Sequence, residues 1–544
     1  MSLERSDSLI LPTGWSEARG SLGRSACVAA YLVLGALTLS PLLWARVPPL
    51  VDYPNHLARM WVLLHAKDIP ALANNYLVDW DLLPNLAMDL VVPALAQLKP
   101  IEIAGRVFIA LTMASLVLGT AALHRALHGR VGLWPLVSLL FIYNSVLYWG
   151  FLNFLFTLGL ALLAFAGWVA SRRWSPARRA VAFALPAAVL FVLHLFGFGV
   201  YGLMVAAYEF GKLRDERRWT MASLLRAAIH LAQFIPAALL WATTLGQLRP
   251  GYTAYNSLAF KGLAAIAPTT FAWLPTALDC AVLLLAANFL CYAKARGVLS
   301  IAPAMRWPLL VMLVAALLMP NWLYGSWAAD LRLPVALAFV LVASLRFAEA
   351  RSQRRAACGF AEAALLLLGL RLWSVSESWS DADRRFAEFR SAAHALPEGA
   401  RLLVVREEMT ADAARFGGVP DLLARREMMM FWHLPALAVI DRNAFLPYLF
   451  TFTTPILFTP HNSAVREMYG RLLLPSELIE SAAGRPLPAP VWPYRAPETS
   501  RWIDWAKEFD FVVWLDFARS RGPVPENLVP WAGGSFFEIY RIEK

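Results

Sequence analysis

The stretch PPLVDYPNHLARM, Pro48–Met60, follows directly on the first long apolar segment of the chain. It contains an acid, an imidazole and a guanidinium, at Asp52, His56 and Arg59. On a helix, offsets of four and three residues bring these side chains to roughly one face. Such a group at a membrane surface can bind a phosphate and move a proton. A simpler interpretation is that Asp52 only caps the helix, because Asp is a favoured N-cap and Pro54 suits a first turn.

The composition around this stretch is that of a polytopic membrane protein. Of the 544 residues, 59% are hydrophobic and 16% are charged, with a mean hydropathy of +0.53. Ordinary soluble proteins are about a quarter charged. The formal net charge is +11, but the basic residues lie in short clusters between apolar segments, as the positive-inside rule expects. The charge therefore indicates topology, and no nucleic-acid partner is predicted.

Apolar segments predict about eleven transmembrane helices within residues 26–373. The polar residues 1–25 are expected to form a cytoplasmic tail, which places residues 47–100 in a large first external loop. Residues 180–210 lie between two basic runs and are predicted to fold as two short helices that meet near His194. Arg greatly outnumbers Lys, and Ala and Leu are abundant, which suggests a bacterium with GC-rich DNA. The expected location is therefore the bacterial inner membrane, with membrane lipids as partners.

From about Ser374 the sequence becomes charged, proline-rich and mixed in pattern. Residues 374–544 are predicted to form an extracytoplasmic α/β domain with a helix at 381–396. Strands are predicted at ARLLVV, PALAVIDR, FDFVVWLD and FFEIYRI, which are residues 400–405, 435–442, 509–516 and 536–542. No glycine-rich phosphate loop follows a predicted strand, so a nucleotide-binding role is not expected. Nothing in the sequence marks His433 and Asp441 as a pair.

Several polar residues from separate parts of the chain converge on the external face in this topology. They are Asp89, the segment Tyr148–Asn153, His194, and Asp330 with Arg332 in YGSWAADLRLP, Tyr324–Pro334. Charges at membrane depth are expensive, so their convergence indicates a polar cavity. Arg332 suits bidentate phosphate contact, or it anchors the head of a helix. His194 is either a functional residue or one satisfied by a backbone carbonyl.

Metal sites are not predicted from the sequence. The four cysteines lie in apolar segments and form no CxxC pair, so neither a metal centre nor a disulfide framework is expected.

The architecture resembles the C-type glycosyltransferase superfold, GT-C. The features that carry the resemblance are a first helix starting inside, an external loop opening with Asp52, many short apolar hairpins and an external C-terminal domain. At motif level the resemblance covers the Asp52 stretch and, more weakly, YGSWAADLRLP. It implies that Asp52 acts as catalytic base or metal ligand and that Arg332 contacts the donor phosphate. The family often has a second acid where this chain has Tyr53, which leaves a divalent cation open.

The function expected on this basis is an inverting hexosyl or pentosyl transfer. The donor is a polyprenyl-phosphate-linked sugar, and the acceptor is a lipid or glycan of the cell envelope at the external membrane face. Asp52 is the predicted catalytic residue, and the predicted substrate-binding residues are His56, Arg59, Asp89, His194, Asp330 and Arg332.

Two alternatives belong to other classes of protein. The first is a lipid or polar-solute transporter or flippase, which commonly contains inverted repeats. No such repeat is found, and the polar residues gather at one face, so both observations count against transport. The second is a non-enzymatic envelope scaffold, which predicts that Asp52, His194 and Arg332 do not face one cavity.

Overall fold

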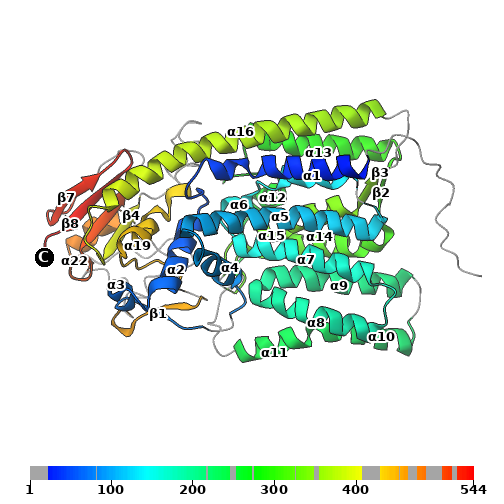
Figure 1. Cartoon of the computed structure of the whole chain (residues 1–544), viewed down its shortest axis with the longest axis horizontal. Coiled ribbons are helices and arrows are strands. Elements are labelled where there is room, and N and C mark those ends of the chain that lie inside the picture. The colour runs from blue at the N-terminus through cyan, green and yellow to red at the C-terminus, as the bar shows by residue number, and fades with distance from the viewer. Residues whose placement is uncertain are drawn as a thin grey trace, which may run out of the picture.

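The computed structural model shows a helical bundle with a small β-sheet at one end, called here the sheet end (Figure 1). The described residues are 23–80, 83–130, 132–215, 219–244, 253–272, 275–324, 326–347, 354–406, 429–451, 454–462, 475–484, 505–516 and 524–544.

Six helical runs among the described residues are long and apolar enough to cross a membrane. They are α5 (Ile101–His128), α7 (Leu152–Ala170), α8 (Pro176–Leu193), the run of α10 (Met221–Leu231) into α11 (Ile235–Thr244), α13 (Ala277–Ala295) and α16 (Arg354–Ala393). Five further described helices belong to the bundle: α1 (Arg24–Thr38), α9 (Leu195–Asp215), α12 (Leu258–Ile266), α14 (Arg306–Leu318) and α15 (Ala329–Ser344). The helices support a multi-pass membrane protein, and the count of eleven spans stays a prediction.

Helices α5 and α7 pack closely at the centre of the bundle. A Cβ atom added to Gly119 of α5 would lie 2.6 Å from the carbonyl oxygen of Gly159 in α7. Small residues let helices approach this closely in a membrane, where packing rather than the hydrophobic effect drives association. Other helices instead expose large apolar side chains, as lipid-facing surfaces do, including Val181, Leu225, Leu239, Leu284 and Leu366.

The predicted break at His194 is confirmed. Ser175 caps α8, with its hydroxyl accepting a hydrogen bond from the Arg178 amide, and Pro176 occupies the first turn. The helix ends at Leu193, and His194 is extended, with φ −170° and ψ 125°. Helix α9 then starts at Leu195.

The residues before α7 form two short pieces. A 3-10 helix spans Trp134–Phe141, and α6 spans Ser145–Tyr148. Tyr148–Asn153 then turns the chain into α7.

Helix α16 connects the bundle to the sheet end. Its 40 residues span about 60 Å at 1.5 Å per residue, roughly twice the thickness of a hydrocarbon core. The boundary predicted at residue 374 falls inside this helix, so the chain passes between the two parts without a linker there.

The sheet has four strands in the order β4-β6-β8-β7. These are β4 (Leu402–Arg406), β6 (Phe511–Leu515), β8 (Phe537–Ile542) and β7 (Leu528–Gly533). β4 and β6 are parallel and the other pairs are antiparallel. The predicted strand at 435–442 is wrong, because these residues contain the helix α19 (Leu437–Arg442). A short buried apolar run fits a helix or a strand equally well, because the spacing of its hydrophobic residues does not distinguish the two.

The first loop is folded and joined to the C-terminal part of the chain. It contains α2 (Tyr53–His65), α3 (Pro70–Ala73), β1 (Tyr76–Val78) and α4 (Ala87–Ala96). β1 pairs antiparallel with β5 (Ile456–Phe458). The helix predicted after Asp52 forms as α2; much of it is buried within the protein, and it contacts α4 and α19. The remaining short helices are α21 (Pro475–Ala482) and α22 (Trp505–Glu508).

Candidate functional site

Asp52 lies at the sheet end, where the segment Tyr148–Asn153 holds its backbone. The amides of Val51 and Asp52 donate to the carbonyl oxygens of Tyr148 and Trp149, at 2.9 and 3.1 Å. Asp52 occupies the N-cap position of α2, but its carboxylate makes no capping hydrogen bond, and its side chain is 18% exposed. The carboxylate is therefore not used as a helix cap, which removes the main support for the simpler interpretation.

Gly150 permits this close approach. Its φ is +84°, in the region that favours glycine, and an added Cβ would lie 3.1 Å from both the Cβ and the backbone nitrogen of Asp52. A side chain at this position would therefore push against the residue that carries the carboxylate.

His433, from the C-terminal part of the chain, reaches the same carboxylate. Its Nε2 lies 3.5 Å from Oδ1 of Asp52, and its side chain is 16% exposed. Its Nδ1 lies 3.1 Å from Nδ2 of Asn55, a fully buried residue of α2. Sequence analysis missed this arrangement because 378 residues separate Asn55 from His433, and no local pattern links them. Asp441 is part of a different pair, with Arg390 of α16 at 2.7 Å.

Arg332 of α15 lies against Phe151, in the segment that holds the backbone of Asp52. The Arg332 guanidinium sits over the rings of Phe151 and Phe196, at 4.6 and 4.7 Å, and donates to the Trp327 carbonyl oxygen at 3.0 Å. Asp52 is close enough to act electrostatically on Arg332, which in turn acts on His194.

His194 is held by its own chain. Its Nδ1 accepts a hydrogen bond from the Phe196 amide at 3.1 Å, rather than donating to a carbonyl. A neutral His194 ring with Nδ1 as acceptor carries its proton on Nε2.

Tryptophan rings from three parts of the chain meet near Asp52. Trp149 contacts Trp327 and Trp432, with ring centroids 4.5 and 6.0 Å apart. The Arg406 guanidinium lies 3.8 Å over the Trp432 ring. Aromatic faces and guanidinium groups of this kind suit the apolar faces of sugars and the charge of phosphates.

His56 lies close to His433 but faces the aromatic ring between them. Both histidine rings lie 5.0 Å from the ring of Phe450. Burial, together with the charge of Arg59, lowers the pKa of His56 well below its ordinary value. Its Nδ1 is buried and has no hydrogen-bond partner among the described residues.

The other predicted site residues are occupied in ion pairs. Arg59 donates to Asp89 at 2.7 Å, with the two side chains 1% and 0% exposed. Asp330 accepts from Asn321 at 3.0 Å and lies 3.5 Å from Lys261. These contacts hold α2 to α4 and hold the start of α15 to its neighbours. The structure thus places Asp52 within electrostatic range of Arg332, and Arg332 within that of His194. His56 lies across the Phe450 ring from His433, while Arg59, Asp89 and Asp330 lie in ion pairs.

A metal site does not emerge from the described part of the chain. No group of three or more His, Cys, Asp or Glu side chains there is arranged to hold a metal ion. Asp52 and His433 form a pair rather than such a group.

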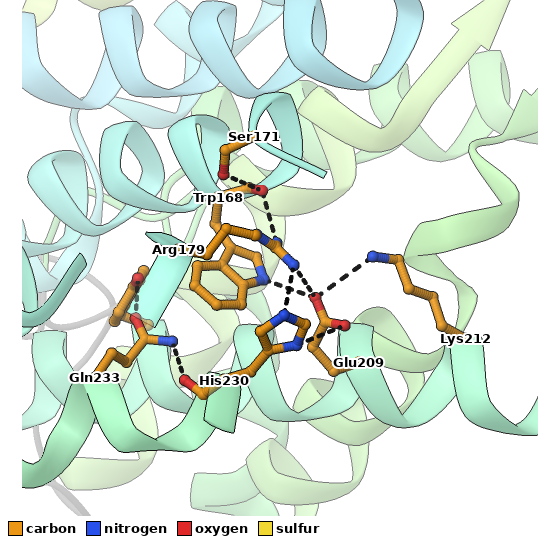
Figure 2. Close-up of polar contacts among 8 residues, drawn as sticks. Trp168, Ser171, Arg179, Glu209, Lys212, His230 and Gln233 are labelled. Atoms are coloured by element: carbon orange, nitrogen blue, oxygen red, sulfur yellow. Dashed lines mark hydrogen bonds and ion pairs between the residues drawn. The ribbon is translucent and has the colours of Figure 1, made fainter. Parts of the chain in front are cut away.

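A second polar cluster lies in the bundle at the start of α8, near the end of α9 and in α10 (Figure 2). Arg179 lies 3.6 Å over the Trp168 ring and donates to Glu209 at 3.1 Å. Glu209 also accepts from Trp168 at 2.9 Å and lies 3.3 Å from His230. The residues largely satisfy one another, so the cluster connects α7, α8, α9 and α10 rather than forming an open site.

A cavity of about 470 Å³ lies elsewhere at the sheet end. Its polar lining includes Arg46, Asp383, Arg390, Ser391, His394 and Asp441. Arg390 is committed to Asp441 and Glu102, and Asp383 accepts from the Arg46 amide, so much of this lining is already paired. Asp52 does not line this cavity.

Comparison with known proteins finds similarity to solved structures only. No family model and no curated protein matches the sequence. A crystal structure of ArnT from Cupriavidus metallidurans in the apo state aligns over 94% of this chain and 96% of that chain, with 12% identity and a TM-score of 0.43. A TM-score of this size is too low to establish a common fold.

Proposed function

We propose that this protein is a membrane glycosyltransferase of the C type. It transfers a sugar from a polyprenyl-phosphate donor to a lipid or glycan acceptor at the external face of a bacterial inner membrane. The observation that carries the proposal is the partly exposed Asp52 carboxylate, which has no capping bond and lies beside His433 and Arg332 at one end of an apolar bundle.

The proposed chemistry is a single displacement. Asp52 accepts the proton of the acceptor hydroxyl as its oxygen attacks the anomeric carbon, and the bond from that carbon to the phosphate oxygen breaks. The electron pair leaves with the polyprenyl phosphate, and the anomeric centre is inverted. No metal step is included, because the described residues near Asp52 do not form a metal-binding group.

Arg332 is the proposed partner of the departing phosphate. A guanidinium offers several fixed donors and suits the developing negative charge. Its Nε is buried with no hydrogen-bond partner among the described residues, so this N–H of Arg332 is free to donate to a phosphate oxygen. His56 and His194 are proposed to orient the donor or the acceptor from the two sides of the site.

The decisive experiment is a lipid-donor assay on the full-length protein in detergent. A panel of polyprenyl-phosphate sugars is supplied with envelope lipids as acceptors, and release of polyprenyl phosphate is measured. Asp52→Asn is expected to lose about 10²–10⁴-fold of the wild-type rate, because the amide cannot accept the proton. The fold is expected to survive, since the partly exposed Asp52 side chain makes no capping hydrogen bond and Asn has nearly the same size and shape.

The matched control is Asp381→Asn on α16. Asp381 has a 45% exposed side chain paired with nearby arginines of the same helix, so its loss should leave the rate unchanged. Wild-type activity in Asp52→Asn contradicts the role of Asp52. If the wild type releases no polyprenyl phosphate from any donor, glycosyl transfer is contradicted. Lipid transport is then the alternative to test.

The scaffold and transport alternatives find less support. Arg332 lies within electrostatic reach of both Asp52 and His194, which a scaffold with dispersed polar residues does not predict. The buried cluster around Glu209 is filled by mutually paired side chains, as a structural cluster is.

A further inference from the structure

The Asn55 side chain has one orientation only. Its Oδ1 accepts from the Phe450 amide at 2.8 Å, and its Nδ2 donates to the Tyr448 carbonyl oxygen at 3.0 Å. A backbone amide can only donate and a carbonyl can only accept, so rotating the amide by 180° would break both bonds. Because Asn55 is fully buried, water cannot replace either bond without cost.

This orientation determines the tautomer of His433. Nδ2 of Asn55 lies 3.1 Å from Nδ1 of His433 and points a hydrogen at it. Nδ1 must therefore accept, and the proton of the neutral ring must lie on Nε2. Nε2 is the atom that lies 3.5 Å from the Asp52 carboxylate. In a doubly protonated ring, the Nδ1–H of His433 would point at an N–H of the Asn55 side chain, and the two hydrogens would repel each other.

We infer that His433 is a positioning residue: the C-terminal part of the chain uses its Nε2–H, fixed by Asn55, to orient the Asp52 carboxylate. The inference rests on the proposed function only for what Asp52 does. His433 takes no proton from the acceptor, because Nδ1 is already occupied and Nε2 already carries a hydrogen. The proton balance of the reaction is unchanged, with the acceptor proton ending on Asp52.

The titratable and charged groups around the pair come from α2, from α15 and from the segment between α19 and β5. His56 of α2 lies across the Phe450 ring, Arg332 of α15 acts on Asp52, and Tyr448 lies with its ring centroid 6.5 Å from that of His433. All three stay in place in the variants below, so a difference between these variants reports on position 433.

The activity test compares two side chains of similar length at position 433. His433→Gln supplies an amide N–H near the position of Nε2–H, whereas His433→Met supplies no donor. We expect His433→Gln to stay within about threefold of the wild type and His433→Met to lose about 10- to 100-fold in kcat/KM, the value of a hydrogen bond to a charged group. The acidic limb of the pH–rate profile should move to higher pH only in His433→Met, because a carboxylate without its donor is protonated more readily.

A second measurement does not depend on turnover. The full-length protein is labelled with ¹⁵N-histidine, placed in lipid bilayers and studied by solid-state NMR, with His433→Gln used to assign the resonance. The expected result is a neutral His433 ring protonated at Nε2. Protonation at Nδ1, or a doubly protonated ring at neutral pH, overturns the inference.

The two measurements separate failure of the inference from failure of the proposed function. If His433→Gln is as impaired as His433→Met and neither acidic limb moves, the donor role of His433 is wrong even though transfer is real. If the wild type releases no polyprenyl phosphate from any donor, the proposed function is wrong, and the NMR result still decides the tautomer.

Discussion

At the scale of single residues, Gly150 sets how closely the chain approaches Asp52. Its φ is positive, and a Cβ added there would lie 3.1 Å from Asp52, so a side chain would be strained and would press on Asp52. We expect Gly150→Ala to lower the free energy of unfolding by about 1–3 kcal/mol, the cost of a residue held in an unfavourable backbone region. Thermal unfolding in detergent, followed by circular dichroism, measures the change.

The control for this prediction is Gly132→Ala. Gly132 has no atom within 4 Å of an added Cβ and no positive φ, so alanine should be tolerated there. Equal melting temperatures for Gly150→Ala and Gly132→Ala would contradict the tight contact between residue 150 and Asp52.

Sequence reasoning singled out some residues of the proposed site and missed others. Asp52, His194 and Arg332 stood out because charged or titratable groups beside apolar segments are costly. His433 and Asn55 did not, since their roles depend on contacts across most of the chain. Arg59 stood out for the same reason as Asp52, yet burial opposite Asp89 is visible only in three dimensions.

At the scale of elements, the Arg59–Asp89 pair holds α2 against α4. Both side chains are buried, so loss of one partner leaves an unpaired charge. We expect Asp89→Asn or Arg59→Met alone to destabilise the protein by about 3–5 kcal/mol. The double variant Arg59→Met with Asp89→Leu should be clearly more stable than either single variant, because no charge remains buried.

The comparison pair for this prediction is Arg384 with Asp381 on α16, which is exposed at 75% and 45%. Breaking it with Asp381→Asn should change stability by no more than about 1 kcal/mol. The prediction is contradicted if the double variant at Arg59 and Asp89 is as unstable as the less stable single variant. The cost of the single variants would then not come from an unpaired buried charge.

Helices and strands were predicted correctly where the pattern of apolar residues, or a break between two helices, allowed only one interpretation. The split between α8 and α9 followed from two basic flanks, which predict that the segment starts and ends on the same side of the membrane and so crosses twice. The strands β4, β6 and β8 followed from short apolar runs, but residues 437–442 form a helix with the same kind of sequence. β7 escaped prediction because Pro530 and exposed residues weaken its pattern, and its pairing with β8 contains a register shift.

At the scale of the whole molecule, two features join the first loop to the C-terminal part. The pairing of β1 with β5 brings the two segments together, and α2 contacts α19. The site is assembled from the loop, the bundle and the C-terminal part, so each contributes a residue: Asp52, Arg332 and His433. Such an assembly cannot be read from local sequence, because no single segment contains it.

The orientation of the molecule in the membrane decides on which face the proposed transfer would occur, and single cysteines can test this orientation. In a variant whose four native cysteines are alanine, Arg384→Cys places a thiol on the exposed side of α16 near the sheet end, and Trp219→Cys places one between α9 and α10. We expect a membrane-impermeant maleimide to label Arg384→Cys in intact spheroplasts and Trp219→Cys only after permeabilisation, since the basic clusters favour a cytoplasmic location for the latter. The reverse pattern would place Asp52 inside the cell, where an acceptor on the external face could not reach it. Equal labelling of both positions before permeabilisation would contradict the spanning bundle itself.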